Sequence, residues 1–242
     1  MTSRLVLCLG DLFIPDRAND IPAKFKKLLT PGKIGQILCL GNLTSPSVYT
    51  FLRNLAPDLQ LVKGDFDISL STSAPPNPNA AYAAPTDQIP VPTALSKVVT
   101  HGGLRIGFTH GHTIVPPGDP DSLLIAARQM DVDVLCWGGT CKFEAYEMEG
   151  KFFVNPGSAT GAVSWSPDAE LDSEGEAVST PSFVLMDVSR HASWANLVDL
   201  SDHPEQVQGD VLVLYVYQLR KDQNGVENVA VEKVSYRKNA SS

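Results

Sequence analysis

Three short apolar runs, each followed by a glycine and a polar side chain, lie in the first third of the chain. They cover residues 4–9, 36–40 and 59–62, and continuous apolar character is typical of strands buried on both faces. Residues 23–29, bounded by prolines, and residues 47–55, with apolar side chains at helical spacing, predict helices between them. This alternation predicts parallel strands joined by right-handed crossovers, with functional groups at the carboxyl ends of the strands.

The rest of the chain is richer in strands than in helices. Residues 121–129 have a helical pattern, and the later strands are expected to pair antiparallel because they follow one another without helices. The expected strands are residues 96–100, 104–109, 133–137, 143–148, 152–155, 182–188, 211–219 and 229–236. The whole predicts an α/β fold with a sandwich of two mixed sheets. We expect one domain over residues 1–242, with flexible insertions near 68–95, 164–180 and 189–210.

Composition and charge narrow the class of protein. The chain is 43% hydrophobic and 19% charged, and its formal net charge is −8. An acidic balance argues against broad nucleic-acid binding and against direct docking on anionic lipid, because both need a basic face. No apolar run approaches the roughly 18 to 20 residues that span a bilayer. Cys8, Cys39 and Cys136 lie in apolar runs without a CxxC pair, which indicates buried thiols in a reducing compartment.

Polar side chains that could bind metal follow several of the predicted strands. The candidates are Asp11, Asn42, Asp65, His110 and Cys141. Two-metal phosphoesterases build their site from oxygen and imidazole ligands at strand ends, and ions about 3.5 to 4 Å apart clamp a phosphoryl group and ionise a water. In this order the pattern resembles the calcineurin-like metallophosphoesterases, which carry Asp-x-His, Gly-Asp, Gly-Asn-His, a His before Gly, and Gly-His-Thr-His.

The match to that family's motifs is partial. Phe13 stands where the first histidine belongs, and Asn42 stands where the aspartate that bridges both metals belongs. Phe66 replaces the histidine that would protonate the leaving group. Gly139 and Cys141 replace both histidines of Gly-His-Thr-His. The resemblance therefore implies the family's fold without its catalytic residues, and we expect no catalytic residue and no resident cofactor.

Three alternatives stay open for the remaining polar residues. One weakly bound Zn or Mn ion is compatible with Asp11, Asp65 and His110 if Cys141 or His112 substitutes for a lost ligand. A phosphoesterase with a reorganised site would use Asp11, Asp65, His110 and Cys141. A small-molecule-binding protein would use the pocket alone, and Asp11 and Asp65 also fit ordinary turn positions.

A closer resemblance covers nearly the whole chain outside the insertions. It rests on residues 22–29 (PAKFKKLL), 62–67 (VKGDFD), 131–134 (DVDV), 155–161 (NPGSATG), 181–187 (PSFVLMD) and 215–219 (YVYQL). These stretches resemble the vacuolar protein sorting family that supplies the small phosphoesterase-like subunit of retromer.

That resemblance implies an α/β/β/α sandwich acting as a non-catalytic scaffold in an endosomal coat for cargo retrieval to the Golgi and plasma membrane. It implies a cytoplasmic protein that is peripheral on endosome membranes, with membrane association only through the complex. The implied partners are a large α-solenoid subunit and, on the opposite face, regulators of endosomal small GTPases.

Two apolar surfaces are candidates for these partners. The first is Ile114, Val115, Pro116 and Pro117, because proline-stiffened apolar loops lose little entropy on docking. By resemblance this loop contacts the solenoid, and the alternative is a loop packed on its own core. In residues 211–219 both alternating faces are apolar, so one is available for a partner. By resemblance the regulator patch comprises Leu5, Leu29, Leu185, Tyr215 and Tyr217, although Leu5 and Leu185 also suit a core.

Overall fold

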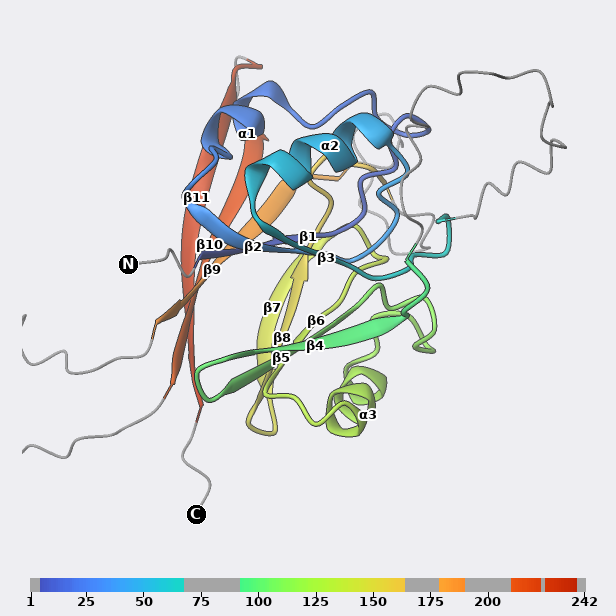
Figure 1. Cartoon of the computed structure of the whole chain (residues 1–242), viewed down its shortest axis with the longest axis vertical. Helices are drawn as coiled ribbons and strands as arrows, with labels where there is room; N and C mark the ends of the chain where they lie inside the picture. The colour runs from blue at the N-terminus through green and yellow to red at the C-terminus, as the bar shows by residue number, and fades with distance from the viewer. Residues whose placement is uncertain (1–4, 68–91, 164–178, 190–209, 223–224, 239–242) are drawn as a thin grey trace, which may run out of the picture.

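The computed structural model describes residues 5–67, 92–163, 179–189, 210–222 and 225–238, which form two stacked sheets flanked by helices (Figure 1). The described elements are β1 (Leu5–Leu9), α1 (Ala23–Leu28), β2 (Ile34–Cys39), α2 (Pro46–Leu55), β3 (Asp58–Leu61), β4 (Ser96–His101), β5 (Leu104–Thr109), α3 (Pro120–Gln129), β6 (Val134–Cys136), β7 (Phe143–Met148), β8 (Lys151–Pro156), β9 (Ser182–Ser189), β10 (Val211–Lys221) and β11 (Glu227–Arg237). Each expected helix and strand is confirmed, with ends that differ by a few residues at most.

Both sheets are mixed. The six-stranded sheet has the order β11-β10-β9-β1-β2-β3, with β1, β2 and β3 parallel as expected and β9, β10 and β11 antiparallel. The five-stranded sheet has the order β4-β5-β6-β8-β7. Antiparallel pairing of the later strands is confirmed for β7 with β8, β9 with β10 and β10 with β11, and is wrong for β6 with β8. β6 also pairs parallel with β5, from which α3 separates it along the chain. Between β5 and β6 the chain returns through α3, and between β6 and β8 it returns along β7. Each return brings the chain to the end of the sheet where the earlier strand began, so the next strand runs parallel to it.

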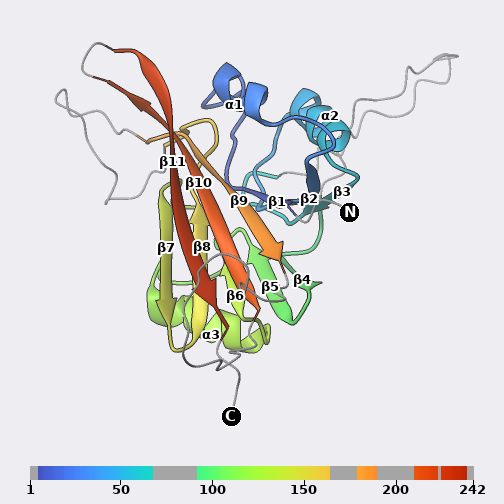
Figure 2. The same ribbon diagram turned by 90° about the vertical axis from the view of Figure 1, so that its left-hand side faces the viewer.

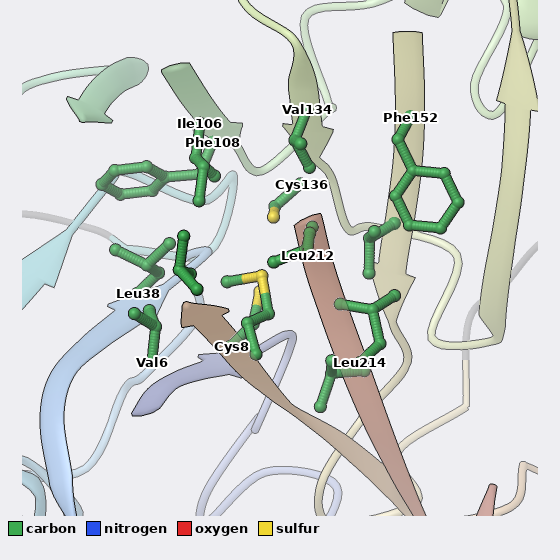
Figure 3. Close-up of a cluster of buried hydrophobic side chains, with 14 of the residues drawn as sticks. Val6, Cys8, Leu38, Ile106, Phe108, Val134, Cys136, Phe152, Leu212 and Leu214 are labelled. Carbon is green, nitrogen blue, oxygen red and sulfur yellow. The ribbon is translucent and has the colours of Figure 1, made fainter. Parts of the chain in front are cut away.

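Side-chain alternation along the strands produces three apolar layers. Val6 and Cys8 point between the sheets, where they meet side chains from β5, β6, β8 and β10 (Figure 3). Leu7 and Leu9 point the other way and pack under α1 and α2. Trp137 belongs to a third layer between the five-stranded sheet and α3. The order helix, sheet, sheet, helix is therefore the expected α/β/β/α sandwich, which a second view shows from the side (Figure 2).

The three expected insertions lie largely outside the described residues, which omit 68–91, 164–178 and 190–209. Where the chain resumes, the amide of Lys63 donates to the carbonyl of Ala94, so the segment leading into β4 lies beside the segment that follows β3. All four cysteines are buried free thiols, and burial raises the pKa of Cys39 to about 12. Among the described helices, none combines the length and the apolar character that a bilayer crossing requires.

Candidate functional site

The loops that follow four strands bring polar side chains together at one end of the sandwich. The side-chain nitrogen Nδ2 of Asn42 lies 2.7 Å from Asp11 Oδ1, 2.9 Å from Asp65 Oδ1 and 2.8 Å from His110 Nε2. His110 Nε2 also lies 2.7 Å from Asp11 Oδ1. We call these four residues the amide cluster, because the Asn42 amide lies at their centre. Four of the five candidate metal ligands therefore converge, as expected from their positions at strand ends.

A backbone hydrogen bond fixes which way the Asn42 amide faces. The amide of Phe66 donates to Asn42 Oδ1 over 2.9 Å, so the carbonyl oxygen points away from the carboxylates and the NH2 group points toward them. The backbone of Asn42 is also held, because its N–H donates to Asp67 Oδ2 over 2.9 Å. An NH2 group has no lone pair for a metal. In this orientation Asn42 is a donor to Asp11 and Asp65 and is not a ligand.

Asp11 and His110 form a buried ion pair. Burial alone would raise the pKa of Asp11, but hydrogen bonds from His110, Gly139 and Asn42 outweigh it and lower that pKa. Burial would lower the pKa of His110, and the hydrogen bond and charge of Asp11 outweigh it and raise that pKa. Burial and the nearby charge of His110 lower the pKa of His112. These directions favour the charged form at His110 more than at His112, and the Nδ1 atoms of the two rings lie 3.0 Å apart.

The fifth candidate ligand lies in a different chemical setting. Cys141 is buried and packs with Phe13 and Ala162 in a small apolar cluster. Burial and the charge of Asp11 raise the pKa of its thiol, whereas metals bind the thiolate. Within the described residues, no group of three or more His, Cys, Asp or Glu has the arrangement of a metal site.

An aromatic cluster lies where two histidines of the family motif would be. Phe13 and Phe66 meet edge to face, with ring centroids 5.3 Å apart. The guanidinium of Arg17 lies 3.9 Å above the Phe13 ring and 5.1 Å from the Phe66 ring. Phe66 is still 45% exposed. The positions that would bind metal and donate a proton are thus filled by apolar rings.

The structure also shows contributors that the sequence interpretation missed. Asp67 Oδ2 accepts from the amides of both Asn42 and Gly64, at 2.9 and 2.8 Å, and holds two loops together. Ser158 Oγ donates to the carbonyl of Asp11 over 2.7 Å. Both residues lie in the quoted stretches 62–67 and 155–161, but sequence alone does not show which backbone groups they reach.

The candidate docking loop, residues 114–117, begins four residues after His110, and it is firmly supported. Ile114 packs on the layer that contains Trp137, and its N–H donates to the carbonyl of Gly111 over 2.9 Å. The carbonyl of Val115 accepts from Ser122 Oγ over 3.0 Å. The side chain of Val115 points outward, because the residue is 75% exposed, and Pro116 and Pro117 are exposed too. A loop held by hydrogen bonds thus presents an apolar surface beside the amide cluster.

The five residues of the regulator patch lie on or beside the outer face of the six-stranded sheet. Leu185 pairs with Leu7 on one side and with Tyr215 on the other, and Tyr217 stacks on Phe183 with centroids 4.7 Å apart. The patch members Leu5, Leu185, Tyr215 and Tyr217 are partly exposed, whereas Leu29 is only 3% exposed and supports Leu185 and Tyr217 in the layer beneath α1. The patch and the docking loop are therefore on opposite sides of the sandwich.

The fold and the polar side chains that converge at its strand ends define the class. Residues 5–189 match the model of the calcineurin-like phosphoesterase superfamily domain. The chain belongs to this superfamily and, within it, to the vacuolar protein sorting-associated protein 29 family.

Relatives in this family match the chain both in sequence and in structure. The Schizosaccharomyces pombe vacuolar protein sorting-associated protein 29 is 45% identical over 234 residues, which are 97% of this chain and 98% of the relative. The crystal structure of Chaetomium thermophilum Vps29 matches with a TM-score of 0.75 and 48% identity over 99% of this chain and all of the other. Wild-type Vps29 from Entamoeba histolytica, complexed with zinc, matches with a TM-score of 0.66 and 33% identity over 96% of this chain and 98% of the other.

Proposed function

We propose that this chain is a non-catalytic scaffold subunit of the retromer coat, acting in retrieval of cargo from endosomes to the Golgi and plasma membrane. The observation that carries this proposal is the state of the phosphoesterase site. The Asn42 amide faces the carboxylates as a donor, and Phe66 stands where the proton donor would be. A phenyl ring cannot act as a general acid. The relatives' involvement in vacuolar protein sorting supports the same reading.

The docking loop is the proposed contact for the large α-solenoid subunit. Val115, Pro116 and Pro117 are exposed and apolar, while Ile114 anchors the loop to the core. Because internal hydrogen bonds already hold this loop, little conformational entropy remains to be lost when a partner covers it.

The patch on the six-stranded sheet is the proposed contact for regulators of endosomal small GTPases. Tyrosine suits such a surface because it has a large apolar body and a polar tip. Tyr215 and Tyr217 lie beside Leu185 on a face that α1 covers only in part. With partners on two opposite sides, the chain would connect the coat to its regulators. It would then be a cytoplasmic protein, peripheral on endosome membranes, with no membrane contact of its own.

A phosphoesterase with a reorganised site is the second candidate, because Asp11, Asp65 and His110 do converge. The zinc complex of the Entamoeba histolytica relative favours testing it.

Affinity purification of the chain from its native cell, with a phosphoesterase assay on the same material, separates the two candidates. The scaffold proposal predicts a large helical-repeat partner and no hydrolysis. A Tyr217→Asp variant should retain that partner and lose the regulators. Hydrolysis that disappears in Asp65→Ala would overturn the scaffold proposal, and loss of both partners in Tyr217→Asp would make Tyr217 a core residue.

A further inference from the structure

We propose that the Asn42 amide replaces the metal ion of this fold, so that the amide cluster positions the docking loop without any metal. This inference rests on the proposed scaffold function for what the loop binds. The claim about metal stands on the geometry of the cluster alone.

The Asn42 NH2 group lies at the centre of the amide cluster. It lies within 2.9 Å of one oxygen of Asp11, one oxygen of Asp65 and the Nε2 of His110. In a phosphoesterase site those same atoms would face the metal ions. To become a ligand, Asn42 would have to turn its oxygen inward, which would break its bond from the Phe66 amide and leave that N–H without its acceptor.

Both carboxylate oxygens of Asp11 already have hydrogen-bond partners. Its Oδ1 accepts from Asn42 and lies 2.7 Å from His110 Nε2, and its Oδ2 accepts from the Gly139 amide over 2.9 Å. A buried carboxylate needs compensating donors or charge, and here both oxygens have them. A metal would have to displace these donors. The residues present therefore do not fit the two-metal centre of the superfamily.

His110 connects the amide cluster to the docking loop. His110 begins the segment that leads to Ile114, and its carbonyl accepts from the Gly138 amide over 3.1 Å. Its Nδ1 lies 3.0 Å from His112 Nδ1, two residues before Ile114. Movement of His110 away from Asp11 would therefore move the start of the loop. In this arrangement Asn42 is a positioning residue, which acts on the partner surface through His110.

Asn42→Asp tests the inference, because it exchanges the inward NH2 group for a carboxylate oxygen while keeping the acceptor for Phe66. Without metal, three carboxylates would meet beside His110, and the melting temperature should fall. Zn²⁺ should then bind more than about tenfold more tightly than to the unaltered chain. A substitution at a residue that only orients a metal ligand already changes metal affinity by about tenfold or more, and Asn42→Asp adds a ligand itself. Zn²⁺ should restore the melting temperature of this variant alone.

Asn42→Leu is the matched control, because leucine has similar size but neither donates nor ligates. It should lose stability, and Zn²⁺ should not restore it. Titration calorimetry with Zn²⁺ and thermal melting of all three chains give the measurements. A stoichiometric, stabilising Zn²⁺ site in the unaltered chain would overturn the inference, as would an Asn42→Asp chain that remains stable and indifferent to Zn²⁺.

Capture of the large partner adds a readout of loop position. Asn42→Asp should capture it poorly without Zn²⁺ and normally with Zn²⁺, while the unaltered chain should be indifferent to chelator. If the unaltered chain captures no such partner but the Zn²⁺ pattern holds, the scaffold function fails and the amide replacement stands. If capture by the unaltered chain needs metal, the amide replacement fails and the scaffold function stands.

Discussion

Two substitutions of Val115, one mild and one severe, test the docking loop. The exposed fraction of this side chain gives its expected contribution to the binding free energy of the large partner. Val115→Ala removes two methyl groups, each worth about 0.8 kcal/mol when buried. The residue is 75% exposed in the free chain, so a partner that covers it fully would gain about 1.2 kcal/mol from them. The Kd for the large partner should therefore rise about eightfold. Val115→Asp would bury an unpaired carboxylate and should abolish measurable binding.

The measurement is the Kd for the purified large partner, by calorimetry or surface binding, together with thermal unfolding of each variant. Stability should change by less than about 0.5 kcal/mol, because the loop is held through the backbone of Val115 and not its side chain. Val226→Asp is the control, since Val226 is 53% exposed near the β10–β11 turn and should bind normally. Normal affinity in a folded Val115→Asp chain would refute the assignment of the loop.

Two further predictions concern the amide cluster. In Gly64→Ala, the new Cβ would lie 2.1 Å from Asn42 Oδ1, so the free energy of unfolding should fall by about 1 to 3 kcal/mol in chemical denaturation; an unchanged midpoint would contradict the packing. The pKa of His110 is raised, so its stabilising contribution is complete below the ordinary value of 6.5 and is lost as pH rises through the raised pKa. The free energy of unfolding, measured at increasing pH above 6.5, should show this loss in the unaltered chain but not in His110→Asn. An equal change of this free energy with pH in the two chains would exclude the ion pair.

The fold could be predicted from the sequence because the hydrophobic pattern of each segment suits its place in the packed structure. The continuous apolar runs became β1 and β2, buried on both faces between helices and a second sheet, and helical spacing in residues 47–55 became α2. The parallel pairing of β6 with β8 was missed because pairing partners depend on where the chain returns, which periodicity does not encode.

The sequence predicts which residues meet at the site but not how their atoms are oriented. Strand ends correctly predicted that Asp11, Asn42, Asp65 and His110 would meet. The direction of the Asn42 amide was not predictable, since a single backbone N–H, that of Phe66, decides it. Whether any metal binds stays a prediction for the experiments on Asn42.

The backbone conformation of Gly139 disfavours the histidine that the family motif carries at this position. Gly139 has φ +90°, and in this conformation its N–H reaches Asp11 Oδ2. A histidine rarely adopts such a φ, and strain of this kind costs about 1 to 3 kcal/mol. Its ring would also meet the region of His110, because a Cβ at this position would lie 3.5 Å from the His110 ring. Relaxing the backbone to fit a histidine would take the donor away from Asp11. The hydrogen bond from the Gly139 N–H to Asp11 and the poor fit of a histidine at position 139 thus depend on the same backbone geometry.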